Sequence, residues 1–223
     1  MTSSTQRRRG RKPRLSQPLI VGAAMRVLAR DGLDGLTIRG IAAELGVKSA
    51  SLYWHFPTRD ALVDRLADEL IAGLPTERAT TADWRTSLRD GSCELFRRLT
   101  SVRDAARVRS GRLVTGPNTL RWMEAGLDLF RRAGLNEVAA AYASHAVHVY
   151  TVGFVLFTAA PLSAGASREA ALSAARGAFA GLERATYPNL VAMAGPLTEG
   201  APETRFLYGL DRLIDGIALD RTT

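Results

Sequence analysis

Apolar and polar positions follow one another along this chain with the spacing of α-helices. Apolar residues recur every three or four positions through most of the 223 residues, and no segment shows a convincing strand pattern. Glycine and proline interrupt the pattern near residues 116–117, 134, 161–165 and 188–202. We therefore predict an all-α fold, with helices at about residues 17–30, 38–45, 48–55, 59–73, 82–100, 104–111, 118–133, 137–159, 167–186 and 203–219.

The segment from Thr37 to Arg59, TIRGIAAELGVKSASLYWHFPTR, is predicted to form a helix-turn-helix. Thr37 is a favoured residue type for capping a helix start, and Gly46 accepts the left-handed conformation in which many helices end. A second helix follows at once and ends before Pro57, because a proline disfavours helical backbone in the residue before it. Two helices joined by so tight a turn are typical of a DNA-binding motif.

The second helix of this motif keeps large aromatic residues away from its buried face. Leu52 and Phe56 are four residues apart and can pack against the first helix, which leaves Tyr53, Trp54 and His55 facing outward. Hydroxyl, indole and imidazole groups hydrogen-bond phosphates and base edges, so a nucleic-acid surface explains these residues. The alternative is that Tyr53 and Trp54 belong to the core of a small helical bundle.

Charge is distributed unevenly along the chain. Residues 1–59 hold eleven Lys or Arg and three Asp or Glu, whereas residues 60–223 hold nineteen of each kind. The whole formal charge of +8 therefore lies in the first quarter of the chain, which indicates that this end meets a polyanion. Six positive charges lie in RRRGRKPR, residues 7–14, either as an arm that contacts phosphates or the minor groove or as a solubilising tail.

The stretch GLTIRGIAAELGVKSASLYWHFPTRDALVD resembles the DNA-binding domain of the TetR family of bacterial transcription regulators, and LYWH at residues 52–55 is the most specific part of the match. The resemblance implies a three-helix head whose first helix spans about residues 17–30. Such repressors bind as dimers to two half-sites related by a two-fold axis. The predicted DNA-contacting residues are Thr37, Arg39, Lys48, Ser49, Ala50, Ser51, Tyr53, Trp54, His55 and Arg59.

The rest of the chain resembles the regulatory body of the same family, especially at VRDAARVRSG and FLYGLDRLIDGI. We expect a basic arm at residues 1–15, the head with its connecting helix at 16–73, a short linker at 75–81, and a larger helical domain for ligand binding and dimerisation at 82–223. The resemblance implies that the connecting helix transmits motion of the body to the head. It also implies a four-helix dimer interface, to which each copy contributes the helices at 137–159 and 203–219.

A stretch of thirty residues between Glu137 and Arg168 contains no Asp, Glu, Lys or Arg and is long enough to cross a bilayer. Polar residues such as His145, His148 and Thr151 interrupt it, however, and its flanks lack anchoring charges. A helix that is apolar nearly all round is more often buried in a core or a dimer interface. We therefore expect an interface helix and no membrane partner.

The sequence offers little to support catalysis or metal binding. It has three histidines and one cysteine, and it contains no G-x-S-x-G, H-E-x-x-H or phosphate-binding glycine loop. His145 and His148 could ligate a metal from one helix face, but no Asp, Glu or Cys lies near them in sequence, so satisfied histidines of a core or interface are the simpler interpretation. We expect no enzyme, no cofactor and no metal site. The single cysteine and the absence of a visible secretion signal fit the cytoplasm.

The body is expected to bind a small-molecule effector. In the repressor that gives the family its name, a histidine of the body contacts a magnesium–drug chelate, and the match through VRDAARVRSG puts Arg109 in that place. Gly91, Gly126 and Phe157 match further positions where that repressor has polar or acidic groups. Because arginine repels Mg²⁺, the resemblance predicts that tetracycline is not the effector. The predicted pocket lining, for which core packing is the alternative role, is Arg109, Trp122, His145, His148 and Phe154.

These five residues suit a flat or apolar molecule, and such a molecule could also carry one acidic group. The sequence as a whole predicts a dimeric repressor that binds a palindromic operator and is released by that molecule. Two other classes of protein stay open. One is an architectural DNA-binding protein with little sequence preference, and the other is a helical small-molecule-binding protein or enzyme whose basic head is incidental.

Overall fold

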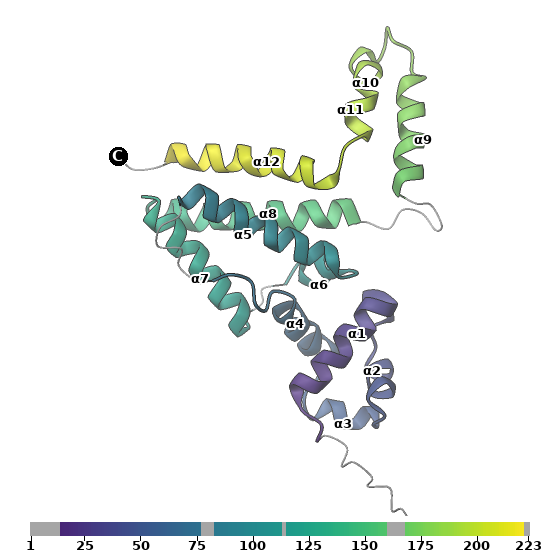
Figure 1. Cartoon of the computed structure of the whole chain (residues 1–223). Coiled ribbons are helices and arrows are strands. Elements are labelled where there is room, and N and C mark those ends of the chain that lie inside the picture. The colour runs from purple at the N-terminus through teal and green to yellow at the C-terminus, as the bar shows by residue number, and fades with distance from the viewer. Residues whose placement is uncertain (1–13, 77–82, 113–114, 160–167, 221–223) are drawn as a thin grey trace, which may run out of the picture.

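The computed structural model describes residues 14–76, 83–112, 115–159 and 168–220, and within these ranges it contains helices and no strand (Figure 1). The all-α prediction is confirmed. Nearly all of the basic arm expected at residues 1–15, most of the linker expected at 75–81, and the break at 161–165 lie outside the described residues.

The head consists of α1 (Gln17–Gly35), α2 (Ile38–Leu45) and α3 (Ser49–Tyr53), and α4 (Arg59–Glu69) leads from it to the rest of the molecule (Figure 1). Regular helix in α1 stops at Gly32, whose φ of 75° and ψ of −178° are not helical. The predicted end of this helix near residue 31 is therefore a kink. The head is held together by fully buried apolar residues, among them Ile20, Leu28, Ile41, Leu52, Leu62 and Leu66.

The body consists of α5 (Trp84–Ser101), α6 (Ala105–Arg109), α7 (Pro117–Arg132), α8 (Glu137–Ala159) and α12 (Pro202–Ile217), followed by a short 3₁₀ turn at Ala218–Asp220. Helices α5, α8 and α12 lie side by side, and α7 packs against α5 and α8 (Figure 1). Phe96 of α5 stacks on Phe206 of α12 at a centroid distance of 4.5 Å. The short α6 contacts α4, α5 and α8, so it lies between the connecting helix and the body.

Helices α9 (Arg168–Ala180), α10 (Pro188–Ala192) and α11 (Ala194–Thr198) project from the body as an arm and pack mainly against one another (Figure 1). The predicted single helix to residue 186 and the predicted break at 188–202 were both wrong, because α9 ends at Ala180 and two short helices follow before Pro202. Pro188 and Pro202 stand at the first position of α10 and α12, where a missing amide proton costs nothing. These prolines begin helices.

Candidate nucleic-acid interface and effector site

The helix-turn-helix forms as the local sequence predicts. The hydroxyl of Thr37 accepts a hydrogen bond from the Gly40 amide at 3.0 Å and so caps α2. At the other end, Gly46 takes the left-handed conformation with φ 64°, and the Val47 amide donates to the Ala42 carbonyl at 3.0 Å. This turn sends the chain directly into α3, which is anchored by buried Leu52.

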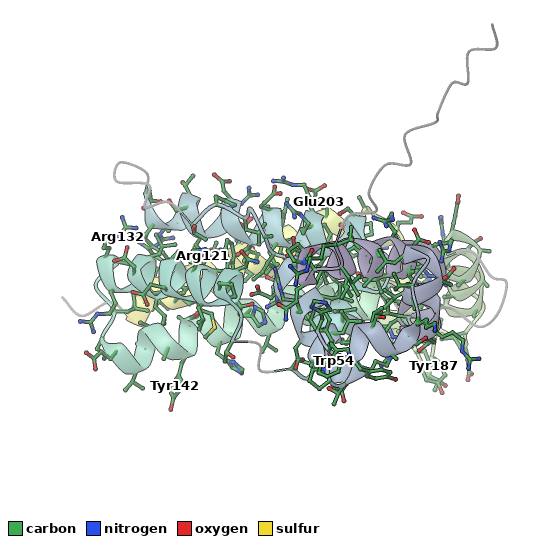
Figure 2. All side chains as sticks on the ribbon, turned by 90° about the horizontal axis from the view of Figure 1, so that it is seen from below. Trp54, Arg121, Arg132, Tyr142, Tyr187 and Glu203 are labelled. Carbon is green, nitrogen blue, oxygen red and sulfur yellow. The ribbon has the colours of Figure 1, made fainter. Side chains whose placement is uncertain are left out.

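The outer face of α3 carries aromatic surface that no part of the described chain covers. Trp54 is 90% exposed and Tyr53 is 51% exposed, and Figure 2 shows Trp54 on the head. Lys48 and Ala50 are also exposed, Ser49, Ser51 and His55 are half-buried, and Arg39 is exposed on α2. The core alternative for Tyr53 and Trp54 is wrong, because these side chains face solvent. Contact of these residues with DNA stays a prediction.

Arg59 has a partner within the head that the sequence did not reveal. Its guanidinium donates from Nε to the Leu36 carbonyl at 3.1 Å and from Nη2 to the Leu33 carbonyl at 2.8 Å. The side chain therefore fastens the start of α4 to the connection between α1 and α2. A DNA contact by Arg59, as predicted, would therefore involve a guanidinium that already makes these two hydrogen bonds.

Asp68 joins α4 to α7, a role that no local sequence pattern indicated. The side chain is 1% exposed, and its carboxylate accepts hydrogen bonds from the Thr119 amide at 2.8 Å, from Asn118 Nδ2 at 3.0 Å and from Arg65 Nη1 at 3.2 Å. A carboxylate at the first turn of α7 also complements the positive end of that helix. Gly116 lies so close that an added Cβ would be 2.2 Å from Asp68 Cγ.

A second set of polar contacts fastens the head to the segment around α6. Asp104 has a left-handed backbone with φ 58°, and its Oδ2 accepts a hydrogen bond from the Leu33 amide at 2.8 Å. Arg107 donates to both oxygens of Asp34 at 3.0 and 3.1 Å, and its cation lowers the pKa of that carboxyl. Arg112, three residues after α6, forms ion pairs with Asp60 and Asp64 of α4.

Of the residues predicted to bind the effector, the structure brings Arg109 and His148 together in the body. Arg109 is 7% exposed, and its Nη1 donates to the Ala67 carbonyl of α4 at 2.7 Å. Burial lowers the pKa of His148 to about 4, and the neighbouring Arg109 cation acts in the same direction, followed by His145. At neutral pH this histidine is therefore uncharged.

The other three predicted effector residues differ in exposure and in the groups that they contact. Trp122 is half-buried in α7, and its ring lies over Gly91 of α5, where an added Cβ would be 3.2 Å from Cη2. His145 is exposed. Phe154 belongs to a cluster of aromatic rings, and its ring centroid lies 5.9 Å from that of Tyr150 and 6.2 Å from that of Phe96. No group of three or more His, Cys, Asp or Glu in the described part of the chain could hold a metal ion.

Two surface hollows lie away from these residues. One, of about 460 Å³, is lined by Arg131, Asn136, Glu137 and Val138, and the other, of about 330 Å³, lies beside Pro196, Thr204 and Tyr208. Neither adjoins Arg109 or His148. The buried polar groups of the body, described above, are therefore the better guide to an effector site.

Helices α8 and α12 expose large apolar side chains. Tyr142, Val149 and Phe157 of α8 are 72%, 51% and 81% exposed, and Tyr208 of α12 is 68% exposed. Figure 2 shows Tyr142 pointing away from the body. Residues Glu137–Thr158 have the length and composition of a membrane span, with a mean hydropathy of 1.2 and 33% of the segment buried. An exposed apolar patch of this kind marks a surface that meets a partner.

Residues 20–66 match the family model described as bacterial regulatory proteins, tetR family, and residues 75–220 match the tetracyclin repressor-like, C-terminal domain. The chain is 31% identical over 214 residues to tetracycline repressor protein class C of Escherichia coli, with 94% of each chain covered. It is 31% identical over 209 residues to an HTH-type transcriptional regulator of Saccharopolyspora erythraea, covering 93% of this chain and 86% of that one.

Solved structures agree with these matches. The TetR family protein ActR of Streptomyces coelicolor, in complex with actinorhodin, superposes with a TM-score of 0.85 at 30% identity, covering 94% of this chain and 100% of that one. ActR in complex with (S)-DNPA superposes with a TM-score of 0.83 at the same identity, covering 92% and 98% of the two chains. The chain therefore belongs to the TetR family of bacterial regulatory proteins, as a ligand-responsive DNA-binding repressor and not an enzyme.

Proposed function

We propose that this protein acts in the cytoplasm as a homodimer that binds a palindromic operator through α3 and leaves it when a small molecule binds the body. The observation that carries the proposal is the contrast within α3 and the turn after it. Leu52 is completely buried and fixes the helix, while Trp54 two residues later is 90% exposed. A rigid helix that presents aromatic and small polar groups to solvent has the form of a recognition helix.

On DNA, the two α3 helices of a dimer would enter successive major grooves, about 34–36 Å apart. We propose that Tyr53, Trp54 and His55 contact phosphates or base edges and that Arg39 and Lys48 neutralise phosphate charge. Both cations belong to the exposed surface of the head, so they are accessible to a polyanion. The small Ser49, Ala50 and Ser51 would let the backbone approach the groove.

The dimer would form through α8 and α12. The exposed residues Tyr142, Val149 and Phe157 are seven and eight positions apart, so they fall on one stripe of α8, and Tyr208 lies on the neighbouring helix. A four-helix interface with a second copy would cover this stripe. The same pairing explains the hydropathy of α8 without a membrane.

The effector would bind among α4, α6, α7 and α8, near Arg109, His148 and Trp122, with His145 and Phe154 as further candidates. The chain's similarity to ActR, which has been solved with actinorhodin, supports a body that accepts a small organic molecule. The positive charge of Arg109 repels Mg²⁺ at this site. We therefore expect that magnesium and tetracycline, added together, do not dissociate the complex with operator DNA. The effector can change DNA affinity only by as much as its own affinity differs between the two states of the protein.

The experiment that tests the proposal is a gel-shift titration against DNA that flanks the protein's own gene, at physiological salt with excess nonspecific competitor. We expect a discrete complex that survives competition, and a loss of about tenfold to a hundredfold in affinity for Tyr53→Ala or Trp54→Ala. Tyr187→Ala removes an exposed tyrosine directly before α10, far from α3 in the sequence. It is the matched control and should bind DNA as the parent protein does.

Two results would overturn the proposal. If Tyr53→Ala and Trp54→Ala both bind the operator with full affinity, α3 is not the recognition helix. Equal affinity for unrelated DNA would indicate an architectural protein.

A further inference from the structure

Arg109 is a buried cation that forms no ion pair with a carboxylate in the described part of the chain. It is 7% exposed, and the nearby Asp68 raises its pKa while the larger effect, burial, lowers it. The oxygens of Asp68, however, are engaged by the Thr119 amide, Asn118 and Arg65, and no ion pair joins Asp68 to Arg109 within the described residues. A buried charge is normally paired, because removing an ion from water carries a large desolvation penalty.

Three buried side-chain atoms lack a hydrogen-bond partner within the described residues, namely Arg109 Nε, Thr119 Oγ1 and Ser87 Oγ. Arg109 Nη1 donates a hydrogen bond to the Ala67 carbonyl, and the next residue, Asp68, accepts one from the Thr119 amide, so the first two atoms belong to one neighbourhood. Buried donors without partners are rare in native proteins, because the lost hydrogen bond to water is not replaced. An acceptor that can use them would be bound favourably here.

The neighbouring groups fit an anionic and aromatic molecule. His148 is uncharged at neutral pH and therefore does not compensate the arginine. Trp122 is half-buried one helical turn after Thr119 on α7, so an aromatic ring lies on the same side of that helix as the Thr119 hydroxyl. A guanidinium is the side chain best suited to hold two oxygens of a carboxylate or a sulfonate.

Resting on the proposed function, we propose that the effector binds as an aromatic anion, with its acidic group on the Arg109 guanidinium and the Thr119 hydroxyl. The class includes aromatic carboxylates, sulfonates and acidic phenolates. This assignment makes Arg109 the residue that selects the effector by charge.

The same arginine would carry the signal to the head. Arg109 Nη1 is bonded to the carbonyl of Ala67 in α4, one residue before Asp68. An anion that accepts hydrogen bonds from the Arg109 guanidinium with two oxygens competes with the Ala67 carbonyl for the same donors. Binding of the anion would therefore loosen α6 from the connecting helix, and α6 also carries Arg107, which pairs with Asp34 of the head.

A pair of fluorescent probes with the same rings tests the proposal. We would titrate the full-length protein with 8-anilinonaphthalene-1-sulfonate, an anion, and with N-phenyl-1-naphthylamine, its neutral counterpart. The parent protein should bind the anion at least about tenfold more tightly, as expected for a hydrogen-bonded charge pair. Equal affinities would overturn the proposal without any variant.

Variants then locate the effect. Arg109→Met should remove the preference for the anion while changing the affinity for the neutral probe less than about twofold, and Arg109→Lys, which keeps the charge, should retain part of it. Arg85→Met, which removes an exposed arginine of α5, is the control and should leave both affinities unchanged. An unaltered preference in Arg109→Met overturns the assignment, and folding of each variant is checked by circular dichroism.

The gel shift separates this proposal from the proposed function. If the anion, and not the neutral probe, releases operator DNA from the parent protein, both proposals are supported. An Arg109-dependent preference for the anion in a protein that forms no specific DNA complex would refute the proposed function alone. Release of DNA by both probes alike, with no effect of Arg109→Met, would refute the anion site alone.

Discussion

Replacing Asp68 by alanine should destabilise the protein more than the loss of any exposed carboxylate. The side chain is 1% exposed, and it accepts hydrogen bonds from the Thr119 amide, from Asn118 and from Arg65. Leaving a buried donor without its acceptor costs about 1–3 kcal/mol, and the Thr119 amide and Asn118 Nδ2 would each lose theirs. Buried Arg109, whose charge Asp68 stabilises, would lose that carboxylate as well. We expect a decrease of about 3–5 kcal/mol in the free energy of unfolding.

The matched control is Asp215→Ala. Asp215 pairs with Arg85, but the two side chains are 57% and 44% exposed, so the pair is screened by solvent and worth about 1 kcal/mol or less. Asp68→Asn, which keeps the shape and one acceptor, should fall between the two. Urea unfolding followed by circular dichroism measures all three at one protein concentration, since dimerisation links stability to concentration. A cost for Asp68→Ala no greater than that for Asp215→Ala would refute the reasoning.

Three further predictions follow from single contacts. Gly32→Ala should lower the free energy of unfolding by about 1–3 kcal/mol, because Gly32 has φ 75° and an added Cβ would lie 2.6 Å from Asp104 Oδ2; an unchanged urea midpoint would contradict this. Arg109→Met should raise the pKa of His148 above about 4, because the arginine cation lowers it, but the pKa should stay below 6.5 because burial is the larger cause. An NMR titration that finds no rise would refute the proximity of Arg109 and His148. Phe157→Glu should shift the dimer toward monomer in sedimentation, since it puts a charge into the proposed interface, and an intact dimer would exclude α8 from it.

Sequence predicted best those features that depend on neighbouring residues. The hydroxyl of Thr37 caps α2 by accepting a hydrogen bond from the amide three residues later, and Gly46 ends α2 in the left-handed conformation. Each of these interactions closes within five residues, so the residue types themselves determine it. The buried face of α3 was predicted for the same reason, because the spacing of Leu52 and Phe56 defines it.

Contacts between distant segments were not predictable in the same way. Asp68 and Thr119 are 51 positions apart, and Asp104 and Leu33 are 71 apart. In the sequence, each acid looks like an ordinary solvated residue of a helix or loop, because nothing local reveals its partner. Helical periodicity likewise gives the face of a residue and not its neighbour, so the contacts of Phe154 with the rings of Phe96, Tyr150 and Phe206 could not be predicted from its place on α8.

The contacts around α4 and α6 differ in strength in a way that suits a switch. Arg107 meets Asp34, which is 84% exposed, and Arg112 meets Asp60, which is 76% exposed, so each of these ion pairs contributes little and exchanges readily with water. The bond between buried Asp68 and α7, in contrast, costs much more to break. A ligand that rearranges α6 therefore has to break these exposed ion pairs and the Arg109–Ala67 hydrogen bond, for which its own contact with Arg109 compensates, while α4 stays fixed to α7. A differential affinity of a few kcal/mol, about what tenfold to hundredfold changes in binding require, is enough to move such an equilibrium.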